Sequence, residues 1–293
     1  MQSEKFVFVH LQKCGGTHAT RILTTHFGAL PVSRGNDEIA GSPLLASVVA
    51  QATLCTTCKC EAAVFGWEDH QPLWCVKCKL EDSLLVGVPK HMAFTPKDGD
   101  TRPIIGIVRS PFALYVSLFA YGATGKGRLA KSIAISHGSA FSERLYKDVL
   151  DVNAFREWLP YAVGDVTMGL VTRRFADLYV EGASAALSSC LAMNEVKVGG
   201  ASKSEASSRC AMVKEVAAGF VRQECLEESL LALLEDTCGV EVLPQIREQV
   251  MGMGRTWTSL HLPYKDYYDD ASRRLVETAD RWVLDRFNYA FDQ

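Results

Sequence analysis

A short apolar run that leads directly into a glycine-rich turn and then a helical pattern is the feature that most constrains the fold. Residues 6–11 are mainly β-branched and aromatic, and the turn KCGGT, residues 13–17, follows almost at once. Over residues 19–27 the apolar positions recur at helical spacing. A strand, a glycine turn and a helix in this order are typical of α/β proteins, in which helices cover a parallel sheet.

Later segments extend the same pattern. Residues 84–88 and 104–108 are short apolar runs without alternation, which predict strands buried on both faces. Pro111 suits the first turn of a helix that continues to about Tyr121. Further helices are expected over residues 153–159, 171–178, 211–220, 226–237 and 272–287. We therefore expect one α/β domain over residues 1–293, with a mainly parallel central sheet, a helix-rich C-terminal half and a flexible Ala/Ser/Gly-rich excursion over residues 181–209.

Charge and the N-terminus limit the classes of partner. The chain carries 31 Lys+Arg and 34 Asp+Glu, a formal net charge of −3. So balanced a composition gives no general basic surface for nucleic acid or an anionic membrane, so neither partner is expected. The sequence shows no signal-peptide pattern and no apolar run long enough to span a membrane. We expect a cytoplasmic protein, in which cysteines are free or bound to metal.

Five of the ten cysteines fall between Cys55 and Cys78. Cys55 and Cys58 form one C-x-x-C pair, Cys75 and Cys78 form a second, and 16 residues separate the pairs. This spacing predicts one tetrahedral Zn²⁺ held by these four thiolates, with Cys60 as an alternative ligand. A structural role is expected because four thiolates leave no open coordination position. The alternatives for this insertion, residues 53–80, are reduced, partly buried cysteines or, in an exported protein, disulfides.

The glycine turn has the composition of an anion clamp. Gly15 and Gly16 let backbone N–H groups converge at a helix N-terminus, while Lys13 adds a full charge and Thr17 a hydroxyl donor. The alternative is an ordinary β-α turn. The order of residues is not that of a Walker A loop, in which the lysine follows the glycines.

Two motifs resemble the sulfotransferases related to heparan sulfate 2-O-sulfotransferase and similar bacterial enzymes. Residues 9–17, VHLQKCGGT, are similar to the loop with which that family grips the 5′-phosphosulfate of 3′-phosphoadenosine 5′-phosphosulfate (PAPS). Arg109-Ser110-Pro111 follows the strand expected over residues 104–108, and Ser117 lies eight residues after Arg109, as in the family's 3′-phosphate motif. Residues 171–175, 219–230 and 285–291 resemble the family more weakly.

The resemblance implies a P-loop-like three-layer fold and a PAPS-dependent sulfotransferase that releases 3′-phosphoadenosine 5′-phosphate (PAP). The residues that it assigns to donor binding are Lys13, Cys14, Gly15, Gly16, Thr17, His18, Arg109, Ser117 and Arg173. The chain departs from the family pattern at Gln12, Cys14, His18, Ser110 and Leu114, where the family has proline, threonine, serine or threonine, an acidic residue and, in many members, arginine, respectively.

Sulfuryl transfer needs a cation at the leaving phosphate and a base for the acceptor. Lys13 is the expected cation. His91, which follows the strand expected over residues 84–88, corresponds to the family's base, and His70 is the alternative. The acceptor would be a hydroxyl or amine of a carbohydrate or small molecule. Tyrosines near Trp257 either line its cleft or belong to the core: Tyr264, Tyr267 and Tyr268.

Two other functions stay open from the sequence. One is a nucleotide- or nucleic-acid-binding protein built around a zinc ribbon, although the ribbon would occupy less than a tenth of the chain and no basic stripe accompanies it. The other is a nucleotide kinase with a degenerate phosphate loop, although no Walker A order is present.

Overall fold

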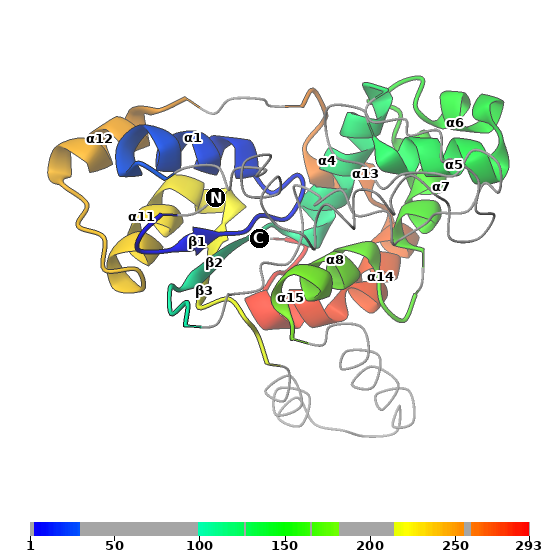
Figure 1. Ribbon diagram of the computed structural model, residues 1–293. Helices are drawn as coiled ribbons and strands as arrows, with labels where there is room; N and C mark the ends of the chain where they lie inside the picture. Colours follow the sequence, from blue (N-terminus) through cyan, green and yellow to red (C-terminus); the bar gives the residue numbers. More distant parts are fainter. Residues whose placement is uncertain are drawn as a thin grey trace, which may run out of the picture.

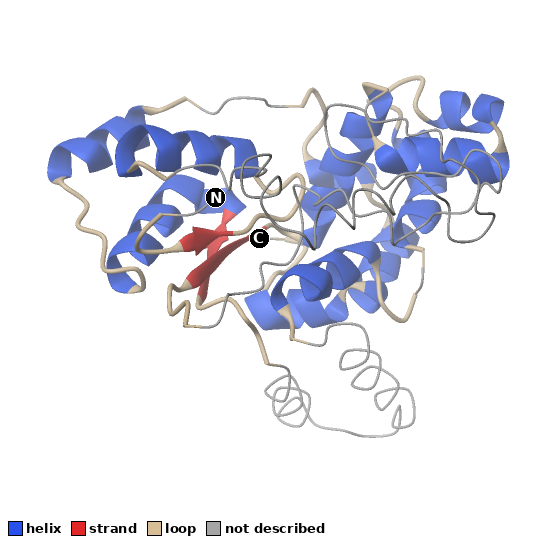
Figure 2. Ribbon diagram, viewed as in Figure 1, coloured by secondary structure: helices blue, strands red, loops and turns tan. Residues whose placement is uncertain are grey.

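The computed structural model describes residues 3–29, 99–125, 127–164, 166–181, 214–254 and 259–292. Over these residues the protein is mixed α/β, with a small parallel sheet of three strands and a majority of helices (Figures 1 and 2). The strands are β1 (Val7–Phe8), β2 (Ile104–Val108) and β3 (Gly219–Arg222), in the order β1-β2-β3. The expected α/β class is therefore confirmed.

Some of the helices in the described residues pack around this sheet, and the others form a second group beside it (Figure 1). Their bounds are α1 (Gly16–Phe27), α4 (Pro111–Ala123), α5 (Arg128–His137), α6 (Ser139–Leu145), α7 (Val152–Val163), α8 (Leu170–Tyr179), the 3-10 turn η1 (Gln223–Cys225), α11 (Leu226–Asp236), α12 (Pro244–Gly252), α13 (Tyr264–Tyr267), α14 (Asp270–Ala279) and α15 (Arg281–Phe287).

Strand β2 is the centre of the sheet, and all five of its residues are buried. It pairs in parallel with β1, where Phe8 lies opposite Ile105, and with β3, where Val108 lies opposite Arg222. Because parallel strands end at the same edge, the loops that follow β1, β2 and β3 meet there. This edge carries the candidate site.

Helices cover both faces of the sheet. In Figure 1, α1 and α11 lie on one side, and α8 and α15 lie on the other. On the second side, Phe220 of β3 packs against Phe175 of α8 and Phe287 of α15, with ring centroids 5.2 Å apart in each pair. The Tyr179 hydroxyl donates to the carbonyl of Val9 (3.0 Å) and accepts from the backbone N–H of Ile107 (3.2 Å), which ties α8 to β1 and β2.

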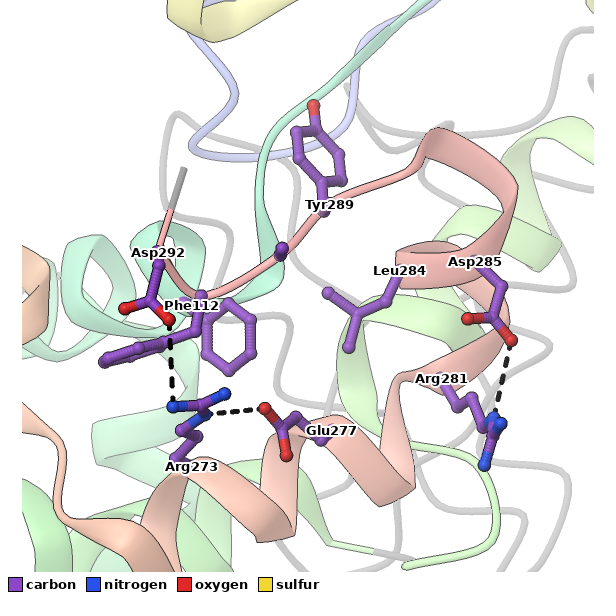
Figure 3. Close-up of a pocket in the computed structure, with 10 residues that line it drawn as sticks. Phe112, Arg273, Glu277, Arg281, Leu284, Asp285, Tyr289 and Asp292 are labelled. Carbon is purple, nitrogen blue, oxygen red and sulfur yellow. Dashed lines mark hydrogen bonds and ion pairs between the residues drawn. The ribbon is translucent and has the colours of Figure 1, made fainter.

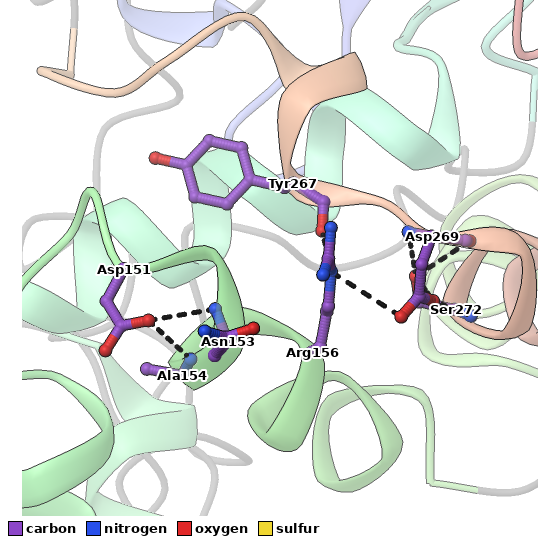
Figure 4. A network of polar contacts seen from close by, with 7 residues as sticks. All are labelled: Asp151, Asn153, Ala154, Arg156, Tyr267, Asp269 and Ser272. Atoms are coloured by element: carbon purple, nitrogen blue, oxygen red, sulfur yellow. Dashed lines mark hydrogen bonds and ion pairs between the residues drawn. The ribbon is translucent and has the colours of Figure 1, made fainter.

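The second group of helices is built around aromatic side chains. Phe119 of α4 contacts Phe155 and Trp158 of α7. Arg156 joins α7 to the α13–α14 turn: its Nε donates to the carbonyl of Tyr267 (2.9 Å) and lies 3.6 Å from the Asp269 carboxylate (Figure 4).

Capping fixes the ends of two helices in this group. The Asp151 carboxylate accepts from the first N–H groups of α7, and Asp269 forms a capping box with Ser272 at the start of α14 (Figure 4). These contacts fix the residues at which α7 and α14 begin.

Several sequence expectations are confirmed, and two are wrong. The strand over residues 104–108 and the helix that starts at Pro111 occur as expected, with Pro111 in the first turn. The helix expected over residues 211–220 is wrong, because residues 219–220 belong to β3 and hydrogen-bond with β2. The single helix expected over residues 272–287 is wrong too, because Asp280 separates α14 from α15.

Asp280 shows why the chain breaks there. Its side chain is fully buried, and its carboxylate accepts from the Tyr115 hydroxyl (2.6 Å) and from the backbone N–H of Thr172 (2.7 Å) in the first turn of α8. Burial raises the pKa of this carboxyl despite the hydrogen bonds. The break between α14 and α15 therefore positions the Asp280 carboxylate at the N-terminus of α8, where it accepts a backbone hydrogen bond.

Some expectations fall on other parts of the chain. The strand over residues 84–88, the cysteine-rich insertion and residues 182–209 of the excursion lie outside the described residues. Within the described ranges, no helix has both the length and the apolar character that crossing a bilayer requires.

Candidate functional site

The loop between β1 and α1 has an unusual backbone. Lys13 has φ 67° and Gly15 has φ 82°, so two of three successive residues are left-handed. Such a conformation is strained for a lysine, and strain of this kind gathers at functional sites. The N-cap position of α1 is Gly15, and no side chain caps the helix or places an acid in its first turn. The start of α1 is therefore positively polarised. We call residues 12–15 the clamp loop.

Both glycines are required by close approach. A Cβ on Gly16 would overlap the His10 ring, and one on Gly15 would lie 2.7 Å from Leu226 Cδ1 and 3.3 Å from Gln223 Cγ. The N-terminus of α11 thus presses against the clamp loop and fixes its path.

Replacing Gly15 with alanine should cost more stability than the same change at Gly28. Both glycines are left-handed, with φ 82° and 59°, but nothing lies within 4 Å of a Cβ on Gly28. The strain alone should cost about 1 kcal/mol at each position, and overpacking against the buried Leu226 should add roughly 1–3 kcal/mol for G15A. Urea unfolding measures both; equal costs would contradict this account of the loop.

Lys13 is half-buried, and its ammonium lies over the ring of Tyr121, 4.2 Å from the ring centroid. Tyr121 lies on α4, one turn beyond Ser117. Burial, and then the charge of Arg109, lower the pKa of Lys13. The aromatic ring holds the Lys13 ammonium in place without neutralising its charge.

Arg109 joins the two sequence motifs. It follows β2, and its Nη1 donates to the carbonyl of Lys13 at 3.0 Å, although the two residues are 96 positions apart in the chain. The parallel pairing of β1 and β2 accounts for this meeting. Ser117 lies two turns along the next helix and is 4% exposed. The predicted cations Lys13 and Arg109 therefore occupy one site.

Other predicted donor residues have different surroundings. Thr17 is exposed in the first turn of α1, whereas Cys14 is fully buried and its backbone N–H donates to the Leu11 carbonyl at 3.3 Å. Burial raises the pKa of Cys14 to about 12, so its thiol stays protonated. His18 is also buried, with its Nε2 2.8 Å from Oε1 of Glu227 on α11. Cys14 and His18 thus pack the base of the loop.

The two neighbouring arginines of α8 point to different partners. Arg173, the predicted donor residue, has its Nη2 3.5 Å from the carbonyl of Val163. Arg174 instead donates from Nη1 to Oε1 of Gln12 in the clamp loop, at 3.3 Å. The structure therefore places Arg174 at the clamp loop, although the sequence motif did not single out this residue.

Glu224 is a second residue that the sequence analysis missed. It follows β3, and its Oε1 accepts from the backbone N–H of Ser110 (2.8 Å) while its Oε2 accepts from the Tyr289 hydroxyl (3.1 Å). Burial, and then Glu224, raise the pKa of Tyr289, which keeps that hydroxyl protonated. Glu224 thereby locks the end of β2 against the C-terminal segment. The sequence analysis expected a helix over residues 211–220, so no predicted strand end marked Glu224.

The tyrosines considered for an acceptor cleft belong to the core. Tyr267 and Tyr268 are buried, and their hydroxyls donate to the carbonyls of Val149 (2.7 Å) and Phe112 (3.0 Å). Tyr264 is partly buried and donates to the carbonyl of Phe291 at 2.6 Å. The alternative that they pack the interior is the one the structure supports.

A cavity of about 300 Å³ includes Tyr289 in its lining (Figure 3), and the hydroxyl of Tyr289 donates to Glu224. Its charged lining is paired within the wall: Arg273 lies 2.7 Å from Glu277, and Arg281 lies 3.4 Å from Asp285. Asp292 is a third acid in the lining, 4.0 Å from Arg273, so the cavity has a net negative charge and suits an anion less well than the clamp loop does.

The remaining predicted residues cannot be placed in this site. His91, His70 and the cysteines Cys55, Cys58, Cys60, Cys75 and Cys78 lie outside the described residues, as does Trp257. In the part of the chain that the structure does describe, no group of three or more His, Cys, Asp or Glu side chains is arranged to hold a metal ion.

Comparisons with known proteins identify no relative of this chain. No protein-family model matches the chain, and no curated protein or solved structure is significantly similar to it.

Proposed function

We propose that this protein is a PAPS-dependent sulfotransferase whose donor site is the clamp loop. The observation that carries the proposal is the hydrogen bond from Arg109 to the carbonyl of Lys13, because it unites the two motifs in one cationic site. A lysine, an arginine and an uncapped helix N-terminus form a set that suits a ligand with several negative charges. Helices on both faces of the parallel sheet support the finer proposal of a P-loop-like three-layer fold.

The residues would act in distinct roles. Lys13 would neutralise the charge that develops on the 5′-phosphate as its oxygen–sulfur bond breaks. His91, or else His70, would take the proton of the acceptor hydroxyl or amine as the new bond to sulfur forms. Arg109 would hold a phosphate with its planar fork and would keep the loop carbonyl of Lys13 in place. The products are PAP and the sulfated carbohydrate or small molecule.

Transfer from labelled PAPS to a panel of carbohydrate and small-molecule acceptors tests this proposal. We expect protein-dependent labelling of at least one acceptor, with one PAP formed for each sulfate transferred. Because an acceptor can be missing from a panel, PAP binding is measured alongside. A protein that binds neither PAPS nor PAP would contradict the proposal.

We also propose a structural Zn²⁺ at Cys55, Cys58, Cys75 and Cys78, with Cys60 as an alternative ligand. The support is the spacing of the two C-x-x-C pairs. Metal analysis of the purified protein should give about one equivalent of zinc, and chelation should lower the melting temperature, because binding of a structural metal is coupled to folding. Less than about a tenth of an equivalent, in protein prepared without chelators, would contradict the site.

A further inference from the structure

Arg174 reaches the clamp loop because of how α8 sits under the sheet. Tyr179 anchors the end of α8 to β1 and β2, and Phe175 packs on Phe220. Successive helix residues differ in direction by about 100°. With Phe175 turned toward the sheet, Arg174 extends to Gln12, whereas Arg173 lies against the carbonyl of Val163. The contact is thus fixed by the packing of the helix.

The surroundings of the clamp loop carry more positive than negative charge. Among the described residues that hydrogen-bond to this loop or act on the pKa of its side chains, Lys13, Arg109 and Arg174 are cations, and Glu224 is the acid. Burial raises the pKa of Cys14, and the charges of Arg109 and Arg174 oppose that rise.

Arg174 also acts on Asp177 of α8: burial raises the pKa of that carboxyl, and the charges of Arg173 and Arg174 oppose the rise. With Asp177 included, three cations and two acids surround the loop, and a multiply charged anion would offset the remaining positive charge.

We propose that Arg174 is the third cation of the donor site and strengthens binding of the anionic donor through its charge. This inference rests on the proposed function. Arg174 would bind the donor and position Gln12. Arg173, which lies against the carbonyl of Val163, would do neither.

Calorimetric titration of PAP into matched variants tests the inference. R174Q removes the charge but keeps a polar side chain, and R174K keeps the charge. Arg247 of α12, an exposed arginine paired with Glu235, provides the control R247Q. The folding of each variant is first checked by thermal melting. If R174Q folds poorly, R174K still reports on the role of the charge.

We expect R174Q to bind PAP roughly tenfold more weakly than the wild type at low salt, as for loss of one charge-assisted contact. R174K should remain within a few-fold of the wild type, and R247Q should match it. The deficit of R174Q should shrink at about 1 M salt, where charges are screened over about 3 Å. A purely structural role would not produce this salt dependence.

The outcomes separate the inference from the proposed function. If the wild type binds PAP and R174Q binds it equally well, the inference alone is overturned. It is also overturned if R174K is as weak as R174Q, or if R173Q weakens binding more than R174Q does. If the wild type does not bind PAP, the proposed function falls and the inference falls with it.

Discussion

Replacing Lys13 with alanine should abolish sulfuryl transfer while leaving the fold intact. The ammonium is the cation expected at the leaving phosphate, and loss of such electrostatic stabilisation should lower the turnover rate by roughly a thousandfold or more. The fold should survive, because alanine and lysine both carry a Cβ and meet the same strain at φ 67°. The contact of Lys13 with the Tyr121 ring contributes only about 0.5–1 kcal/mol.

Turnover and thermal melting of K13A, measured together, check this expectation. The control is K147A, which removes an exposed lysine after α6. K147A should turn over like the wild type. Wild-type turnover by K13A would contradict the proposed mechanism, and a large fall in its melting temperature would show that Lys13 supports the loop rather than the chemistry.

Replacing His91 with alanine is the change with the second largest expected effect. Loss of a general base should lower the turnover rate by roughly a hundredfold or more. A histidine base accepts a proton only when it is neutral, so wild-type activity should decline as the pH falls below about 6.5. H91A should have the lower turnover rate, and its activity should no longer decline below this pH.

The matched variant H70A decides between the two candidate bases. If His91 is the base, H70A keeps most of the activity and the same pH profile as the wild type. If H70A loses activity and its low-pH decline while H91A keeps both, His70 is the base and the assignment of His91 is wrong.

The elements predicted best from the sequence are those that local signals define. Residues 104–108 form one uninterrupted apolar run, and Pro111 is suited to a first helical turn, so β2 and the start of α4 occur as expected. Residues 219–222 carry no such signal, because a short run of Phe220 and Val221 fits a helix as well as a strand. Pairing with β2, a contact between distant segments, decides that they form β3.

The candidate site likewise contains residues that local sequence signals predict and residues that only tertiary packing brings there. The meeting of Lys13 and Arg109 follows from motifs at the ends of parallel strands, and the structure contains it. Arg174 and Glu224 act on this site from elements whose position depends on tertiary packing, so no local pattern marks them. The choice between Arg173 and Arg174 in particular depends on the rotation of α8, which Tyr179 and Phe175 set.

Titration of the wild-type protein with PAP and, separately, with ATP tests the central claim most directly, because it requires no acceptor. A sulfotransferase donor site predicts one PAP bound per chain, with an affinity at least about tenfold higher than that for ATP, a difference of about 1.4 kcal/mol. Tighter binding of ATP would favour a nucleotide kinase. Binding of neither nucleotide would contradict the assignment of the clamp loop as a donor site.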